Sequence, residues 1–177
     1  MTFAASAGVW IVGTTFCIIL TIILNEPVQS AVVRLGAGFA PRAPRNLTGL
    51  WRLEYQYTAR GQKNAESQVV ELRSFAGAVF GRTIYSQNHR YEIKGRLRQE
   101  LYFTGYWHSI LPGQAYHGSF QLTLHLNGSD MAGKWLGFSE IGHAINHGEW
   151  TWKRLSQRVN QRERMDAIKA LESEKTR

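Results

Sequence analysis

Aromatic, cationic and hydrogen-bonding side chains recur near one end of the strands that we expect between residues 46 and 155. We expect the ligand contacts to be Tyr55, Tyr57, Arg60, Tyr85, Arg90, Tyr91, Trp107 and His108. Aromatic rings offer faces on which a nucleobase stacks, and Arg and His side chains donate hydrogen bonds to phosphate oxygens. These residue types together predict a site for a ligand that combines bases with phosphates.

The same stretch lacks the motifs of a catalytic or metal site. It contains no Gly-x-Ser-x-Gly motif, no paired inward carboxylates and no Gly-rich loop that leads into a helix. His143 and His147 are four residues apart, a spacing that suits metal ligands on a helix, but they fall in a turn-to-strand segment without a Cys or carboxylate pattern. We therefore predict a binding protein that is not an enzyme, with no metal and no cofactor.

Alternating apolar and polar residues predict the strands that position these side chains. On the first strand Trp51, Leu53, Tyr55 and Tyr57 alternate with polar residues, and the same period recurs along the chain. We expect strands near residues 51–57, 70–73, 78–86, 91–97, 101–107, 118–126, 131–137 and 148–154, with a polar turn over Ala59–Glu66. The Asn127-Gly128 pair is a strong hairpin signal. The fold class is all-β, an eight-stranded up-and-down antiparallel barrel whose interior is filled or holds one small ligand.

Two residues at the other end of this barrel are expected to have a structural role. Gly49-Leu50-Trp51 on the first strand and Arg154 on the last resemble lipocalin-like barrels, in which a Trp closes one end and an Arg packs across it. We assign Trp51 and Arg154 to barrel closure. Strand direction then places the ligand contacts at the opposite, open rim.

An uncharged run of 22 residues, Phe3–Leu24, precedes the barrel. A helix of about 20 apolar residues crosses a bilayer core, so the run predicts a transmembrane helix. The alternative is a signal peptide, but a basic leading region is missing and the apolar run is long. Arg34, Arg42 and Arg45 follow the run, and positive flanking charge places the rest of the chain in the cytoplasm.

The division of the chain follows from these segments. We expect a transmembrane anchor over residues 1–26, a juxtamembrane linker over 27–45, a ligand-sensing barrel over 46–155 and a polar tail over 156–177, which forms a frayed helix or is disordered. The net charge of +8 is spread over the last three segments without a Lys/Arg-rich run. Diffuse charge of this kind argues against DNA or RNA as a partner.

A membrane anchor followed by a small barrel resembles the membrane-anchored effectors of bacterial cyclic-oligonucleotide anti-phage signalling, the SMODS-associating two-transmembrane β-strand-rich family. The residues that carry the resemblance are Gly49-Leu50-Trp51, Gly105-Tyr106-Trp107, Gly118-Ser119-Phe120, Gly133-Lys134-Trp135-Leu136-Gly137 and Gly148-Glu149-Trp150-Thr151-Trp152. The family has two membrane helices, whereas the sequence here predicts one.

The resemblance implies a barrel that binds a cyclic di- or trinucleotide, membrane segments that gather in a homo-oligomer, and disruption of the bacterial inner membrane. It implies a single-pass protein of that membrane with its barrel in the cytoplasm. Two alternatives stay open from the residues alone. One is a membrane-tethered carrier of a small apolar ligand, and the other is a filled barrel that serves as an assembly module.

Overall fold

The computed structural model describes residues 46–59, 62–139 and 144–175, together with Ala31 and Leu35. The expected anchor, residues 1–26, lies outside the described residues, as does the expected linker apart from those two positions. Within the described residues, no helix has both the length and the apolar character to cross a membrane.

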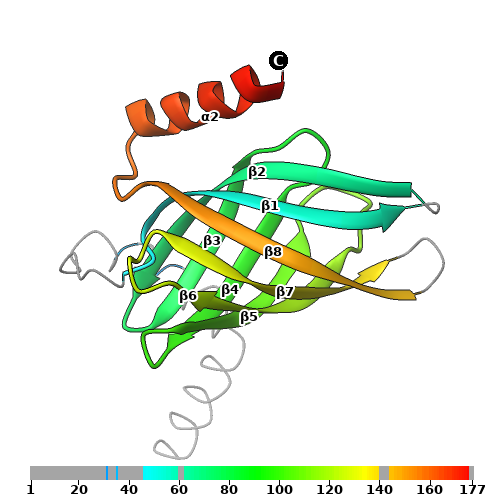
Figure 1. Ribbon diagram of the computed structural model, residues 1–177, viewed down its shortest axis with the longest axis horizontal. Coiled ribbons are helices and arrows are strands. Elements are labelled where there is room, and N and C mark those ends of the chain that lie inside the picture. Colours follow the sequence, from blue (N-terminus) through cyan, green and yellow to red (C-terminus); the bar gives the residue numbers. More distant parts are fainter. Residues whose placement is uncertain (1–30, 32–34, 36–45, 60–61, 140–143, 176–177) are drawn as a thin grey trace, which may run out of the picture.

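Eight antiparallel strands close into one barrel, as the alternation predicts (Figure 1). Each strand pairs with the next along the chain, and the first pairs with the last, where Trp51 lies opposite Arg154. The strands are β1 (Gly49–Ala59), β2 (Gln62–Phe75), β3 (Ala78–Tyr85), β4 (Tyr91–Arg98), β5 (Tyr102–Ser109), β6 (His117–Leu124), β7 (Asp130–Ser139) and β8 (Ala144–Ser156). The all-β class and the up-and-down barrel are thus confirmed.

Every second residue of a strand points into the barrel, because successive side chains of a strand alternate between its two faces. The interior cluster draws on all eight strands and includes Trp51, Leu72, Ile93, Phe103 and Trp152, all buried. Two kinds of inward glycine make room for them. At Gly105 an added Cβ would lie 2.0 Å from the Lys94 carbonyl oxygen, whereas at Gly137 it would lie 2.5 Å from the Trp107 ring. The first glycine permits close strand approach and the second accommodates a large side chain.

The turn that we expected over Ala59–Glu66 is mostly strand. β2 begins at Gln62, and Tyr55 of β1 lies opposite Glu66 of β2. The expectation was wrong because this part of β2 is polar on both faces, which hides the two-residue period. The long β1–β2 hairpin therefore carries Glu66 inside the barrel, where it is buried.

The tail contains an ordered helix, α2 (Gln161–Lys175), on the outside of the barrel beside β1 and β2 (Figure 1). The Asn160 side chain caps its start by accepting a hydrogen bond from the Glu163 amide at 2.9 Å. Its few apolar residues form a second cluster, in which Ala167 and Leu171 pack against Leu50 and Val69. A disordered tail is therefore excluded over these residues.

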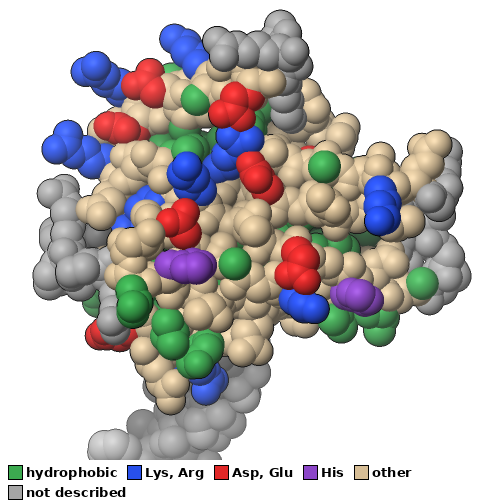
Figure 2. All heavy atoms as spheres, in the orientation of Figure 1, with side chains coloured by type: hydrophobic (Ala, Val, Ile, Leu, Met, Phe, Trp, Pro, Cys, Tyr) green, Lys and Arg blue, Asp and Glu red, His purple; other side chains and the backbone are tan. Residues whose placement is uncertain are grey.

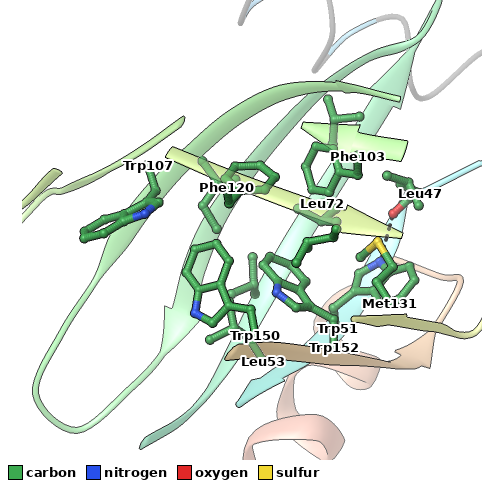
Figure 3. Close-up of a cluster of buried hydrophobic side chains, with 14 of the residues drawn as sticks. Leu47, Trp51, Leu53, Leu72, Phe103, Trp107, Phe120, Met131, Trp150 and Trp152 are labelled. Carbon is green, nitrogen blue, oxygen red and sulfur yellow. Dashed lines mark hydrogen bonds between the residues drawn. The ribbon is translucent and has the colours of Figure 1, made fainter. Parts of the chain in front are cut away.

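One end of the barrel is closed by a packed and hydrogen-bonded group (Figure 3). The Trp51 indole N–H donates to the Leu47 carbonyl at 2.9 Å. The Arg154 guanidinium lies 4.5 Å from the centre of the Trp51 ring and donates to the Asn46 carbonyl at 2.6 Å. Burial lowers the pKa of Arg154 below its ordinary value. These contacts place Trp51 and Arg154 at the closed end, in the positions that the sequence assigned to them.

Candidate functional site

The opposite end of the barrel contains a cavity of about 250 Å³. Its wall is mostly aromatic, with contributions from β1, β4, β5, β7 and β8 and from two connections. The lining residues are Tyr55, Tyr57, Thr58, His89, Tyr91, Trp107, Tyr116, Trp135, Gly137, Phe138, Ala144, Asn146 and Trp150. None of these described residues is Lys or Arg. Small-molecule sites usually measure about 300–1,000 Å³, so the cavity suits one ring system better than a large ligand.

Four of the eight predicted contacts, Tyr55, Tyr57, Tyr91 and Trp107, line this cavity. They come from three strands that are separated in the sequence, and each occupies an inward position of its strand. Their rings contact one another or the cavity wall at edge or tilted angles. Tyr91 and Trp107, for example, have centroids 4.9 Å apart at 66°. The barrel thus brings these four together as the alternation predicts.

Three other predicted contacts lie outside the barrel. Tyr85 packs with the outer cluster beneath α2, next to a register shift between Val69 and Val70 of the paired strand β2. Arg90 is exposed and lines a groove between β3 and α2. His108 points outward, with its Nε2 4.0 Å from Glu92 Oε1.

The reasons for these differences are local. His108 follows the inward Trp107 directly, and strand geometry cannot turn two consecutive side chains to one face. Arg90 lies in the connection before β4, and a bulge of the β2–β3 pair accompanies the outward turn of Tyr85. Arg60 lies outside the described residues.

A buried polar network centred on Glu66 adjoins the cavity. The Glu66 side chain is 3 % exposed. Its carboxylate accepts hydrogen bonds from Tyr55 at 3.1 Å, Ser86 at 2.6 Å and Gln68 at 3.4 Å. Gln68 also donates to the Tyr55 hydroxyl at 3.2 Å and accepts from Thr83 at 3.1 Å. A buried charge needs such partners, so this network holds the carboxylate in one place.

His89 connects this network to the cavity. Its Nε2 lies 3.6 Å from Glu66 Oε2, and its ring contacts three tyrosine rings. The centroid distances are 5.9 Å to Tyr57, 6.0 Å to Tyr91 and 6.1 Å to Tyr116, and only the Tyr91 pair is stacked. Its other ring nitrogen, Nδ1, is buried and has no hydrogen-bond partner among the described residues.

The phenols of the site stay protonated well above neutral pH. Burial, followed by the nearby Tyr91 and Glu66, raises the pKa of Tyr55 far above its ordinary value. Burial also raises the pKa of Tyr91, and burial followed by Glu66 raises that of Tyr57. The three hydroxyls therefore act as neutral donors or acceptors.

Three buried indole N–H groups on the cavity wall also lack a partner among the described residues. They belong to Trp107, Trp135 and Trp150, each at most 7 % exposed. Figure 3 shows Trp107 at the end of the aromatic cluster farthest from Leu47 and the closed end. A buried donor without an acceptor is costly, and a ligand that supplies acceptors recovers that cost.

Sequence reasoning did not assign Glu66, His89, Trp135 or Trp150 to the site. Glu66 had a usable signal, because extending the two-residue period of Leu72 and Val70 backwards reaches Gln68 and then Glu66. Trp135 and Trp150 were indistinguishable from core residues. For metals, the described residues contain no group of three or more His, Cys, Asp or Glu side chains that could hold an ion, and His143 lies outside them.

Acidic and basic side chains are interspersed on the outer face that Figure 2 shows, rather than separated into fields of one sign. Among the described side chains on that face, no field of one charge sign offers a second candidate site beside the cavity. The chain matches no protein-family model and no curated protein, so the function is argued from this geometry.

Proposed function

We propose that the protein is a membrane-anchored sensor whose barrel binds a cyclic di- or trinucleotide by taking one base into the open-end cavity. The observation that carries the proposal is the aromatic cavity, whose wall includes buried indole N–H groups that have no acceptor among the described residues. A nucleobase offers a flat face for the tyrosine and tryptophan rings, and acceptor atoms on its edge for the N–H groups. The cavity volume suits one base, which would leave the sugar and phosphates at the rim.

The effector step of the proposal rests on the apolar run Phe3–Leu24. We propose that ligand binding favours a homo-oligomer in which these segments gather in the bacterial inner membrane and disrupt it, with the barrels on the cytoplasmic side. A ligand can drive this step only if it binds the oligomer more tightly than the monomer. No catalytic step is needed.

A second candidate has its own support. Because no Lys or Arg is found among the described lining residues, the cavity also suits a neutral ring compound, as in a membrane-tethered carrier. The two candidates differ in their salt dependence. Binding of a phosphate-bearing ligand weakens with added salt, whereas binding of a neutral ligand does not.

The test is thermal unfolding of the full chain in detergent micelles against a panel of cyclic di- and trinucleotides, with adenosine, a fatty acid and retinol for comparison. A ligand at 100 times its Kd stabilises by about 2.7 kcal/mol, which raises the midpoint by roughly 5–10 °C. A shift with one cyclic nucleotide that declines with salt supports the first candidate. A salt-independent shift with the fatty acid or retinol alone supports the carrier.

Two variants connect the result to the cavity. Tyr57→Ala removes a partly exposed ring from the cavity mouth and should abolish most of the shift. His108→Ala is the matched control, because His108 lies on the outer face. Equal shifts in the two variants would contradict the site assignment.

A further inference from the structure

A phosphate that enters or borders the cavity needs a strong donor, and the described wall supplies neither Lys nor Arg. Arg90, which the sequence suggested for this role, lines the outer groove instead. An anion held without a positive partner in an aromatic site would lose its hydration and gain little. A phosphate contact then needs another cationic group, and among the described lining residues His89 is the one that can carry a positive charge.

His89 is fixed in position from several sides. It lies between β3 and β4, and its backbone N–H donates to the Ser86 hydroxyl at 3.3 Å. Its ring is stacked on Tyr91 and meets Tyr57 and Tyr116 edge to face. Tyrosine faces stabilise a nearby positive charge.

The carboxylate of Glu66 sets the orientation of this ring. It faces Nε2 at 3.6 Å, and it is itself held by Tyr55, Ser86 and Gln68. The opposite nitrogen, Nδ1, is buried without a partner among the described residues. A histidine with one nitrogen turned to a carboxylate presents the other nitrogen to a ligand, as metal-binding histidines do.

We propose that protonated His89 is the cationic contact for a phosphate oxygen of the ligand, with Glu66 as its positioning residue. The protonated ring forms an ion pair through Nε2 with the Glu66 carboxylate and donates Nδ1–H to the phosphate. This inference rests on the proposed function and deepens it, because it assigns the phosphate contact that the cavity otherwise lacks. Where the free ring is neutral, binding takes up one proton.

The pH dependence follows from the groups around the ring. From β1 it is faced by Tyr57, with Tyr55 behind it, from β2 by Glu66, from β4 by Tyr91 and from the β5–β6 connection by Tyr116. The raised pKa values of Tyr55, Tyr57 and Tyr91 keep those phenols neutral over the range in which histidine titrates. Ionisation of these three phenols therefore does not account for a change in binding between pH 8 and pH 5.5.

The test compares 3′,5′-cyclic AMP with adenosine, using calorimetric Kd values for the full chain in detergent micelles. The two probes share a base, and the phosphodiester keeps its single negative charge between pH 5.5 and pH 8, so a pH-dependent preference belongs to the protein. Wild type should prefer cyclic AMP by about tenfold at pH 5.5, the scale of a charge-assisted hydrogen bond, and lose most of this preference by pH 8.

The variants are His89→Gln and Glu66→Gln. His108→Gln is the matched control, because His108 also faces a glutamate, Glu92, but lies on the outer face of the barrel. His89→Gln should lower the preference for cyclic AMP over adenosine about tenfold at pH 5.5, so that the two probes bind with similar Kd values. Glu66→Gln should reduce the preference and flatten its pH profile, an effect that a merely structural role would not produce. The His89 side chain is partly exposed, so we expect His89→Gln to fold. If Glu66→Gln fails to fold, the His89→Gln variant decides whether His89 contacts the phosphate.

Each outcome has a distinct meaning. If His89→Gln keeps the wild-type preference for cyclic AMP, or if wild type binds both probes equally at pH 5.5, the inference is overturned and the nucleobase site stands. If wild type binds neither probe, the nucleobase site and the inference both fail.

Discussion

Trp51 at the closed end and Trp107 at the open end are both buried, yet only Trp51 has a partner for its indole N–H among the described residues. Trp51 also lies beneath the Arg154 guanidinium, whereas Trp107 borders a cavity. Thus Trp51 completes a packed structure at the closed end, whereas Trp107 leaves an indole N–H without an acceptor among the described residues at the open end. Most buried polar groups in proteins have a hydrogen-bond partner. Trp152 Nε1 and Arg154 Nε, which do not line the cavity, also lack a partner among the described residues, so it is the cavity beside Trp107 that marks the open end as the place where a ligand is expected.

The polar groups of the two ends differ in the same way. At the closed end Arg154 donates through Nη2 to the Asn46 carbonyl and covers the Trp51 ring, and its Nε has no partner among the described residues. At the open end Glu66 has several hydrogen-bond partners, but Nδ1 of the His89 that it faces has none among the residues that the structure describes. The closed end therefore contributes to stability, and the open end retains capacity for binding.

The largest effect should come from Trp51→Ala. Removing this ring empties a fully buried site, leaves the Leu47 carbonyl without its donor and removes the ring on which Arg154 packs. We expect a loss of about 3–5 kcal/mol in the free energy of unfolding, measured by urea denaturation. A loss below about 1 kcal/mol would show that the closed end does not hold the barrel together, and the contrast between the two ends would fail.

The sequence predicted the fold because the two-residue period is visible wherever the barrel interior is apolar. It is clearest on the strand that contains Tyr91 and Ile93, where polar residues mark the outer face. It was lost on β2, because Glu66 and Gln68 are polar residues inside the barrel. Two features have no local sequence signal, because both depend on contacts between strands. They are the bulge beside Tyr85 and the absence of an acceptor for the Trp107 indole N–H among the described residues.

Helix α2 was left undecided for a related reason. It has few apolar residues, and only two of them, Ala167 and Leu171, are buried against the barrel. Its position depends on a matching apolar pair on the outer face of the barrel, Leu50 and Val69. From the sequence alone, apolar strand residues such as Leu50 and Val69 would be assigned to the barrel interior. Only the structure shows that their side chains lie on the outer face.

A medium effect with a defined pH dependence is expected for Tyr55→Phe. At pH 7 the variant should lose about 1–2 kcal/mol, because the hydroxyl links Glu66 and Gln68. Wild-type Tyr55 has a pKa raised above its ordinary value of 10.0, so above that pH the unfolded chain loses a proton that the folded chain keeps. Stability present below pH 10 is therefore lost as the pH rises further, by up to about 1.4 kcal/mol per unit for this group.

Phenylalanine cannot ionise, so the variant should lose less stability above pH 10 than wild type does. Urea denaturation of both proteins at pH 7 and pH 11 measures the difference, which should narrow or reverse at pH 11. An unchanged difference at the two pH values would mean that Tyr55 ionises in the folded protein as freely as in the unfolded one. The open-end network would then be less shielded from water than its burial indicates.

The smallest effect on stability, and the sharpest contrast between the ends, is expected from Trp107→Phe beside Trp51→Phe. Both changes keep an aromatic ring and remove an indole N–H. Trp51→Phe breaks the hydrogen bond to Leu47 and should cost about 1 kcal/mol more than Trp107→Phe, because the Trp107 N–H has no partner among the described residues. Binding should show the opposite order: the Kd for adenosine should rise about fivefold or more in Trp107→Phe and stay unchanged in Trp51→Phe, because only Trp107 lines the cavity. Equal Kd values in the two variants would mean that the free indole donor at the open end plays no part in recognition, and that the rings bind the base by stacking alone.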